Sequence, residues 1–553
     1  MRARLPAEQG RVMVANGRTG FARKAGIALG ATVALLAALR LASRLPDNGG
    51  ESASSPPPEP GTRLADATAS AAAAHPGLSG LHLLDAALDA FAARMLLARA
   101  AERTLDLQYY IWHGDRTGTL LLEAIHQAAE RGVRVRLLLD DNGIAGLDTI
   151  LAALDRHPNI AVRIFNPFRI RFPKAIGFLA DFHRLNRRMH NKSFVADGAV
   201  AILGGRNIGD EYFGAQDGGL FADLDVLAIG ETVPGVAREF DRYWNSACAY
   251  PAAQILRRVS EGQRRKLARR ASAVERDPSA RDYVERIREL PLIDALLAGT
   301  LDVVWARVDV ISEPPEKVLG QAPEAALLAG QIEDVIGTPA RELCVIAGYF
   351  VPGEKGAAMF ADFARRGVSV KILTNSYAAN DVGIVHAGYA PRRRPLLEAG
   401  VRLFEICGTT GGAPTRRQRR RGHRLGIGSR LRGSGSGSVA ALRSSASTLH
   451  AKTFAVDRER LFIGSFNFDP RSAELNTELG FVIDSPDLAA RIAESFDEVV
   501  PKMSYEVKLV GDALTWTEQG ERNTVVHTSE PNMTLTDRAI VALAERLPIE
   551  HLL

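Results

Sequence analysis

Residues 190–207 read HNKSFVADGAVAILGGRN, and residues 450–467 read HAKTFAVDRERLFIGSFN. Both stretches carry the pattern HxKxxxxD, and both continue at the same offsets to a glycine and an asparagine. A lone histidine in an apolar strand is most often a core residue, but a duplicated set indicates a functional site. The shared polar residues are His190, Lys192, Asp197 and Asn207 in the first copy and His450, Lys452, Asp457 and Asn467 in the second.

A second repeat surrounds these motifs and is visible without them. In each half a strand-like run precedes a helical pattern, which ends in a glycine followed by an alternating apolar strand. The order strand, helix, strand predicts parallel pairing, so we expect two similar α/β domains in one chain. The stretches are 105–112, 119–130 and 129–139 in the first half and 343–351, 357–365 and 364–373 in the second.

The composition agrees with a globular body. The chain has 553 residues, of which 46% are hydrophobic and 24% charged, so disorder, collagen and coiled coil are excluded for the chain as a whole. The net charge of +5 is too small to indicate a nucleic-acid binder. The three cysteines are widely spaced and odd in number, which predicts neither a disulfide framework nor a zinc cluster.

The residue types in the motifs suit phosphoryl chemistry without a metal or other cofactor. Two lysines and two asparagines can donate hydrogen bonds to a phosphoryl group. One histidine can attack phosphorus while the other protonates the leaving oxygen and later activates the acceptor hydroxyl. Each ring needs a carboxylate on its far nitrogen, and the candidates are Asp223 and Glu478, which follow Asn207 and Asn467 at corresponding places. Asp197 and Asp457 either join this chemistry or anchor the turn after each motif.

The duplicated motif resembles that of the phospholipase D superfamily, and more closely that of the bacterial cardiolipin synthases of C type. The resemblance runs from about residue 80 to the C-terminus and is carried by 105–112, 131–142, 185–194, 204–214, 374–389 and 462–471. It implies two homologous phospholipase D-like α/β/α domains related by a pseudo-twofold axis, with one active site at their interface. It also implies transfer of a phosphatidyl group through a phosphohistidine to phosphatidylglycerol, giving cardiolipin, with phosphatidylethanolamine as a candidate donor.

The motif residues match the family's catalytic positions, and the family's habit favours His190 as nucleophile and His450 as general acid and base. One departure from the commoner pattern is Gly205-Arg206, where the second copy has Ser465-Phe466. Arg206 either adds a cation beside a substrate or pairs with a nearby acid. Arg206 and Ser465 are therefore expected as substrate-binding residues.

An apolar run at 25–39 lies between Lys24 and Arg40, and most of the nearby arginines precede it. We expect an uncleaved membrane anchor with a cytoplasmic N-terminus, in the inner membrane of a bacterium. A cleaved signal peptide and a buried soluble helix are the alternatives. The predicted segments are a basic tail (1–24), the anchor (25–44), a flexible Pro/Ser/Ala-rich linker (45–79), the first domain (80–250), a helical connection (251–300), the second domain (301–510) with an Arg/Gly/Ser-rich insert at 408–438, and a C-terminal extension (511–553).

Three other functions fit parts of this pattern. The same fold can use water as acceptor and hydrolyse phospholipids to phosphatidic acid. A superfamily nuclease is disfavoured by the anchor, so no nucleic-acid partner is expected, although the arginines of the insert would suit one. A non-catalytic lipid-binding protein would require a defect that neither motif copy shows. The expected partners are phospholipids and the membrane, and an accessory protein is left open.

Overall fold

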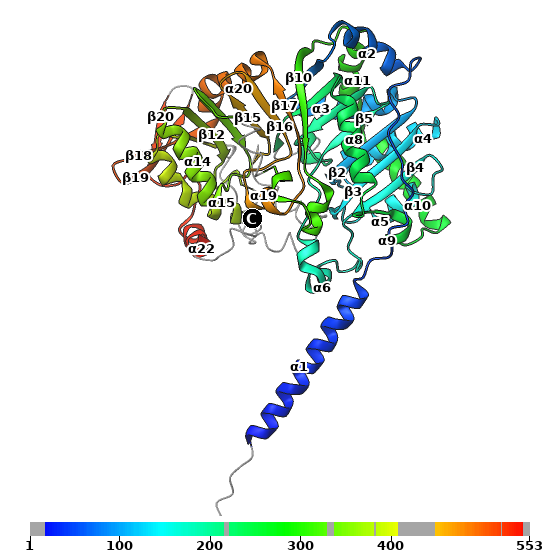
Figure 1. The fold of residues 1–553 in the computed structure, drawn as a ribbon, viewed down its shortest axis with the longest axis horizontal. Coiled ribbons are helices and arrows are strands. Elements are labelled where there is room, and N and C mark those ends of the chain that lie inside the picture. Colours follow the sequence, from blue (N-terminus) through cyan, green and yellow to red (C-terminus); the bar gives the residue numbers. More distant parts are fainter. Residues whose placement is uncertain are drawn as a thin grey trace, which may run out of the picture.

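The computed structural model describes residues 17–214, 221–328, 337–380, 383–407, 448–520 and 523–545. The predicted insert at 408–438 and the first 16 residues of the predicted basic tail lie outside this set. The body consists of two α/β halves placed side by side, and helix α1 extends from one end of it (Figure 1).

The first half is built on three parallel strands: β2 (Thr104–Ile111), β3 (Arg134–Gly143) and β4 (Ile160–Phe165). Helix α4 (Arg116–Glu130) connects β2 to β3, and its N-cap residue Asp115 accepts a hydrogen bond from the backbone N–H of Gly118. The sheet continues beyond β2 through four antiparallel strands: β5 (Ser193–Ala196), β6 (Val200–Gly204), β8 (Asp225–Gly230) and β1 (Ser79–Leu84).

The second half repeats this order. Parallel strands β11 (Glu342–Ala347), β12 (Ser369–Asn375) and β13 (Arg402–Ile406) adjoin antiparallel β15 (Lys452–Val456), β16 (Arg460–Gly464) and β17 (Leu479–Asp484). Strand β10 (Val304–Ser312) pairs first with β1 and then with β17, and so joins the two sheets. The prediction of two similar α/β halves with parallel strands is confirmed.

The other elements cover or extend these sheets. In the first half and the connection they are α2 (Arg63–Ala74), α3 (Ala87–Ala100), α5 (Asp148–Leu154), α6 (Ala175–Leu185), α7 (Asp210–Phe213), β7 (Phe221–Ala222), α8 (Val233–Trp244), β9 (Ala249–Pro251), α9 (Ala252–Ile255), α10 (Glu261–Arg276), α11 (Pro278–Arg288) and α12 (Leu292–Leu297). In the second half they are η1 (Pro315–Leu319), η2 (Glu324–Ala326), α14 (Gly353–Arg365), α15 (Gly383–Tyr389), η3 (Ala390–Arg392), α16 (Arg393–Glu398), β14 (Thr448–Leu449), α19 (Pro470–Glu474), α20 (Pro486–Glu498), α21 (Val500–Met503), β18 (Ser504–Val510), β19 (Ala513–Gln519), β20 (Thr524–His527) and α22 (Leu535–Glu545).

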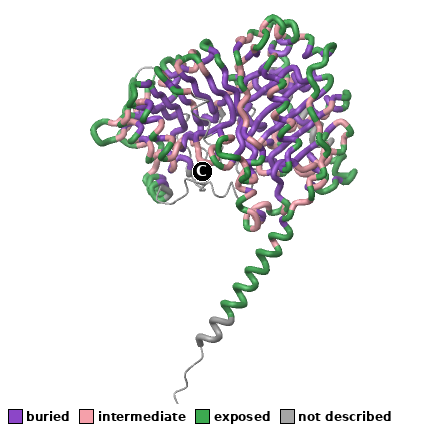
Figure 2. Tube along the Cα trace, in the orientation of Figure 1, coloured by how far each residue is buried: buried purple, intermediate pink, exposed green. Residues whose placement is uncertain are grey.

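The central strands of both halves are buried along most of their length, and Figure 2 shows them as purple traces through the body. Three consecutive leucines of β3, Leu137, Leu138 and Leu139, are fully buried. Such continuous apolar runs are typical of parallel strands that helices cover on both faces. This packing fixes the strand ends from which the motif residues emerge.

The segment that was expected as a flexible linker (45–79) lies against the first half, and its later part forms α2, whose Leu64 is fully buried. Arg136 of β3 pairs with Asp106 at 2.6 Å and with Asp241 at 2.8 Å, and the Ser55 hydroxyl donates to Asp106 at 2.8 Å. Backbone carbonyl groups of the segment also accept hydrogen bonds from arginines, including that of Ala53 from Arg136. The composition of the segment gave no sign of these partners, because they lie far away in the sequence.

Helix α1 (Gly17–Ala42) contains the predicted anchor. Its stretch Lys24–Ala42 has 19 residues with a mean hydropathy of 1.9 and buries none of its apolar window in the body. Figure 2 shows this helix exposed along its described length. A buried soluble helix is therefore wrong, and among the described residues this is the one helix long and apolar enough to cross a membrane.

Candidate active site

The two motif copies meet between the halves. His190 precedes β5 and its backbone N–H donates to the carbonyl oxygen of Thr477, which belongs to the second half. His450 lies between β14 and β15, and its backbone N–H donates to the carbonyl oxygen of Ala222 in the first half. The short strands β14 and β7 pair in parallel at this point. Each histidine is thus held by the backbone of the opposite half.

The carboxylate partners cross between the halves in the same way. Nδ1 of His190 lies 2.9 Å from the Glu478 carboxylate, and Nδ1 of His450 lies 2.5 Å from that of Asp223. Both predicted carboxylates therefore contact a motif histidine, each from the other half of the chain. A neutral ring that donates its Nδ1 proton to a carboxylate keeps the Nε2 lone pair free. That arrangement is what a nucleophilic or basic imidazole requires.

Burial and positive charge keep both rings neutral. Burial lowers the pKa of His190 well below its ordinary value, and the charges of Lys192 and Lys452 and the ring of His450 add to this effect. Burial, together with Lys452, lowers the pKa of His450 to about 4, although the Asp223 carboxylate opposes the shift. The mutual influence of His190, Lys452 and His450 shows that both copies belong to one site.

The two partner carboxylates differ in charge state. Burial raises the pKa of Glu478 to about 7, although Lys192 and the Ser465 hydroxyl act in the opposite direction. Burial also acts to raise the pKa of Asp223, but the nearby His450 and Lys452 hold that pKa well below its usual range. A firmly ionised Asp223 stabilises an imidazolium at His450 better than Glu478 does at His190. This difference favours His450 as the acid and His190 as the nucleophile.

Lys192 and Lys452 lie beside their histidines, as the motif spacing predicts. Each ammonium donates to the backbone carbonyl oxygen of the histidine two residues earlier, and that of Lys452 also lies 3.1 Å from Nδ1 of His450. Burial lowers the pKa of Lys192 well below its ordinary value, while Glu478 acts in the opposite direction. The lysines supply donors in a buried site, where an anionic group would be bound strongly.

The two asparagines occupy unequal environments. The Asn207 side-chain oxygen accepts from the backbone N–H of Ile111 at 3.1 Å, and its amide nitrogen donates to the Tyr212 hydroxyl at 3.1 Å. The buried side-chain oxygen of Asn467 has no hydrogen-bond partner within the described part of the chain. Asn207 is therefore fixed by the fold, whereas Asn467 retains an acceptor.

The departure at Gly205-Arg206 has a steric explanation. A Cβ atom at Gly205 would lie 2.1 Å from an oxygen of Asp223, so this position requires glycine. At the equivalent position the Ser465 hydroxyl donates to the Glu478 carboxylate and accepts from the backbone N–H of Leu479 at 3.0 Å. Ser465 therefore positions Glu478.

Arg206 is buried and bonded to groups of the first half. Its guanidinium donates to the carbonyl oxygens of Leu84 and Asp85 at 2.6 and 2.7 Å, and it lies 3.5 Å from the buried Asp225 carboxylate. These contacts support the alternative in which Arg206 pairs with an acid, not the one in which it binds substrate.

Asp197 and Asp457 hold turns. Their φ angles are 51° and 53°, in the left-handed region, and each carboxylate accepts hydrogen bonds from three successive backbone N–H groups. The donors are residues 102–104 for Asp197 and residues 340–342 for Asp457, at the start of β2 and β11. This geometry supports the anchoring alternative, in which the motif aspartates join the motif turn to a neighbouring strand.

We expect Asp197→Ala to lower the free energy of unfolding by about 3 kcal/mol, because three backbone amides lose their acceptor and that of Thr104 is buried. Asp457→Ala should lower the free energy of unfolding by about half as much, since Asp457 is half-buried and water can replace its carboxylate. Denaturant unfolding of both variants measures this, with the exposed Asp512→Ala as control. Unchanged stability with lost turnover would instead give the aspartates a catalytic role.

The sequence did not reveal the side chains that hold the residue before each histidine. Asp140 accepts from the backbone N–H of Met189 at 3.0 Å, and Asn375 accepts from that of Leu449 at 2.8 Å. Asp140 and Asn375 occupy equivalent positions at the ends of β3 and β12, so aligning the two repeats would have found them. Aromatic rings near the histidines were also missed: Tyr110 beside His190, and Tyr212 and Tyr349 beside His450.

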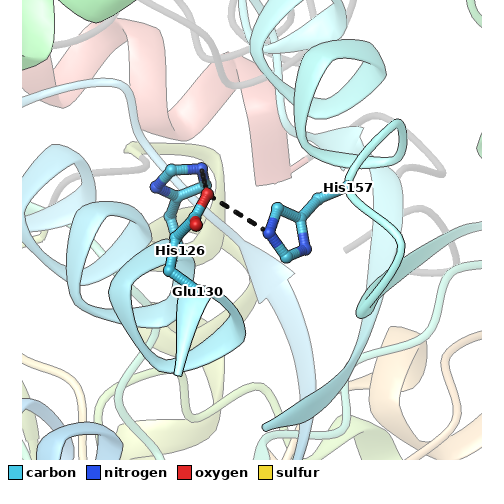
Figure 3. Close-up of side chains that lie close together, drawn as sticks. All are labelled: His126, Glu130 and His157. Carbon is cyan, nitrogen blue, oxygen red and sulfur yellow. Dashed lines mark ion pairs between the residues drawn. The ribbon is translucent and has the colours of Figure 1, made fainter. Parts of the chain in front are cut away.

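Two groups of side chains elsewhere have the composition of a cation site. In one, His126 and His157 face Glu130, and Nε2 of His157 lies 3.3 Å from its carboxylate (Figure 3). The backbone N–H of Asn159 donates to Nδ1 of His157, so Nε2 carries the proton and donates to Glu130. In the other, His113 and Glu211 adjoin Asp115, which caps α4. Neither group contains a motif residue.

Comparisons with known proteins agree with this geometry. The family model described as "Cardiolipin synthase, PLD-like domain" matches residues 95–244 and 335–500. The chain is 45% identical over 466 residues to cardiolipin synthase C of Escherichia coli strain K12, covering 84% of this chain and 94% of that protein. It is 23% identical over 400 residues to a cardiolipin synthase of Staphylococcus aureus, covering 72% of this chain and 62% of that protein.

Among solved structures, the phosphatidylserine synthase of Haemophilus influenzae Rd KW20 superposes with a TM-score of 0.53 at 13% identity. It covers 86% of this chain and 97% of that one, so the likeness concerns the fold. The two stretches matched by the family model coincide with the two halves that each provide a histidine, a lysine and a crossed carboxylate. On these findings, the chain belongs to the family of cardiolipin synthases with phospholipase D-like domains.

Proposed function

We propose that this protein makes cardiolipin by transferring a phosphatidyl group to the glycerol hydroxyl of phosphatidylglycerol. The observation that carries the proposal is the pair of buried, neutral histidines, each with a carboxylate on Nδ1 supplied by the other half. Two equivalent imidazoles in one site suit a reaction with two successive displacements at phosphorus. Family membership and the likeness to cardiolipin synthase C support the choice of lipid.

In the first displacement, Nε2 of His190 attacks the phosphorus atom of the donor lipid. The P–N bond forms as the P–O bond to the headgroup breaks, and Nε2–H of His450 gives its proton to the leaving oxygen. Lys192 and Lys452 donate to the phosphoryl oxygens. Binding of the anionic phosphodiester raises the pKa of His450, so the ring acquires its proton together with the substrate.

In the second displacement, His450 removes the proton from a hydroxyl of phosphatidylglycerol. The new P–O bond forms as the P–N bond breaks, which releases cardiolipin and restores neutral His190. The proton lost by His450 in the first step is thereby regained. Asp223 stabilises the imidazolium whenever His450 is charged.

We propose that helix α1 is a single N-terminal anchor in the inner membrane of a bacterium, so that the chemistry takes place at a membrane. Its 19-residue apolar stretch meets the length requirement of about 20 residues. Substrates and product then remain in the bilayer.

Product analysis tests the function. The full chain in lipid nanodiscs would receive phosphatidylglycerol labelled in its terminal glycerol, with or without ethanolamine-labelled phosphatidylethanolamine. Cardiolipin with released glycerol would identify phosphatidylglycerol as the donor, and released ethanolamine would identify phosphatidylethanolamine. The His190→Ala and His450→Ala chains are the controls. Phosphatidic acid as the sole product would contradict the proposal and indicate hydrolysis.

The rate of cardiolipin formation should rise with pH through an apparent pKa of about 7. Below this pH, Glu478 is protonated and no longer accepts the Nδ1 proton of His190, so the Nε2 lone pair is not held free. Because the two groups interact, the apparent pKa belongs to the pair. A pH profile of kcat/KM measures this, and the rising limb should be absent in Glu478→Gln. A limb that persists in that variant would assign it to another group.

A further inference from the structure

A cluster of apolar side chains projects from the first half next to the anchor. Phe172, Leu179 and Phe182 have exposed fractions of 92%, 69% and 52%, on α6 and the loop before it. Phe178 of α6 packs against Phe168 with ring centroids 5.3 Å apart, and this contact attaches α6 to the body. We name Phe172, Leu179 and Phe182 the α6 face. Three large apolar side chains this exposed on one short segment indicate an interaction site.

The position of the α6 face indicates what covers it. Helix α6 contacts α1, and both lie at the end of the body from which α1 leaves (Figure 1). Helix α22 lies at the same end, where Leu535 and Leu543 are 82% and 62% exposed. If α1 crosses a membrane, the bilayer surface faces this end. The α6 face therefore continues the surface that the anchor already defines.

The polar residues around the face suit the headgroup layer. Arg169 and His183 are exposed beside Phe172 and Phe182. Basic groups next to inserted aromatic rings are typical of segments that lie in the membrane interface, where anionic headgroups attract them. Rings of this kind sit at the boundary between headgroups and acyl chains.

The α6 face is also connected to the active site. Helix α6 ends at Leu185, shortly before His190. Asn186 accepts hydrogen bonds from Arg471 of the second half, at 2.8 Å through its side chain and 2.6 Å through its backbone. The depth of α6 in a bilayer would therefore be transmitted to the loop that carries His190.

We propose that the α6 face inserts into the lipid bilayer as a second, interfacial attachment that sets the height of the active site above the membrane. The inference rests on the proposed function for its occupant, a phospholipid surface. Its test, however, measures depth and not turnover.

The test uses the full chain in nanodiscs of phosphatidylcholine with a minority of phosphatidylglycerol. An environment-sensitive fluorophore is attached at Leu179→Cys, with Cys407 replaced by Ser because it is the half-buried native thiol. Val526→Cys on β20 is the matched control, since Val526 is 57% exposed but lies outside the α6 face. Lipids with a nitroxide on the acyl chain should quench the probe at 179 by roughly twofold and leave that at 526 unchanged. Iodide in the water should show the reverse.

Equal quenching by iodide at 179 and 526 would overturn the proposal, because the face would then lie in water. Protection at 179 from both quenchers would also overturn it, since protein, such as a second copy of the chain, would then cover the face. The quenching is also measured in the His190→Ala chain, which should turn over no lipid. If the α6 face inserts in that chain and the unsubstituted chain turns over no lipid either, the membrane attachment is supported and the proposed function is rejected.

Discussion

Replacing His190 by Ala is expected to lower the rate of cardiolipin formation by about 10⁴-fold or more, because it removes the atom that bonds to phosphorus. His450→Ala should lower the rate to a similar extent with natural lipids, since an alkoxide headgroup leaves slowly without a proton. Rates with natural lipids therefore show that both rings are needed but do not separate their roles. The surface variant His126→Ala is the control and should keep the full rate.

A donor lipid with a nitrophenyl headgroup separates the two roles, because nitrophenolate leaves without protonation. His450→Ala should release one equivalent of nitrophenolate in a burst and retain a phosphatidyl group on His190. His190→Ala should give no burst, and mass spectrometry of a digest would locate the phosphorus. A burst in His190→Ala with the adduct on His450 would reverse the assignment.

Asp223→Asn is expected to reduce kcat by about 10³- to 10⁴-fold, as loss of the carboxylate that orients a catalytic imidazole does elsewhere. The amide has the same shape but does not stabilise the imidazolium that His450 must become. Glu478→Gln should reduce kcat by about 10³-fold, because the His190 ring loses the carboxylate that holds its tautomer. Neither variant is expected to change KM substantially, since the carboxylates contact the rings and not the lipid.

Glu474→Gln is the matched control, because Glu474 is exposed on α19 close in sequence to Glu478. Its kcat should equal that of the unsubstituted chain. The pH profile gives a second reading: the rising limb near pH 7 should persist in Asp223→Asn and vanish in Glu478→Gln. If either isosteric variant lost thermal stability in proportion to its rate, the carboxylate would be structural and the assignment would fail.

The fold could be predicted because both kinds of repeat lie within short stretches of sequence. The pattern of helix, glycine and apolar strand that ends at Leu139 and Leu373 could be recognised from local periodicity alone. The structure contains the parallel strands that this pattern predicted. The candidates for the carboxylate role, Asp223 and Glu478, followed from their matched places after the asparagines. That each serves the histidine of the opposite half could not be predicted, because the pairing depends on how the halves dock.

Other features escaped prediction for the same physical reason. The sequence around Ser55 shows only a polar, proline-rich segment, while its partners Asp106 and Asp241 lie on distant elements. Arg206 was ambiguous because its alternatives differ only in the direction of a long side chain. Contacts between residues far apart in the chain decide both cases.

The crossed carboxylates make each half chemically incomplete. A chain whose halves had not yet docked would have two histidines without the groups that orient them, so a partly folded protein could not cleave the membrane lipids around it. The geometry of the site is complete only when the two halves close on each other. Docking of the halves is therefore the step that brings each histidine to its carboxylate.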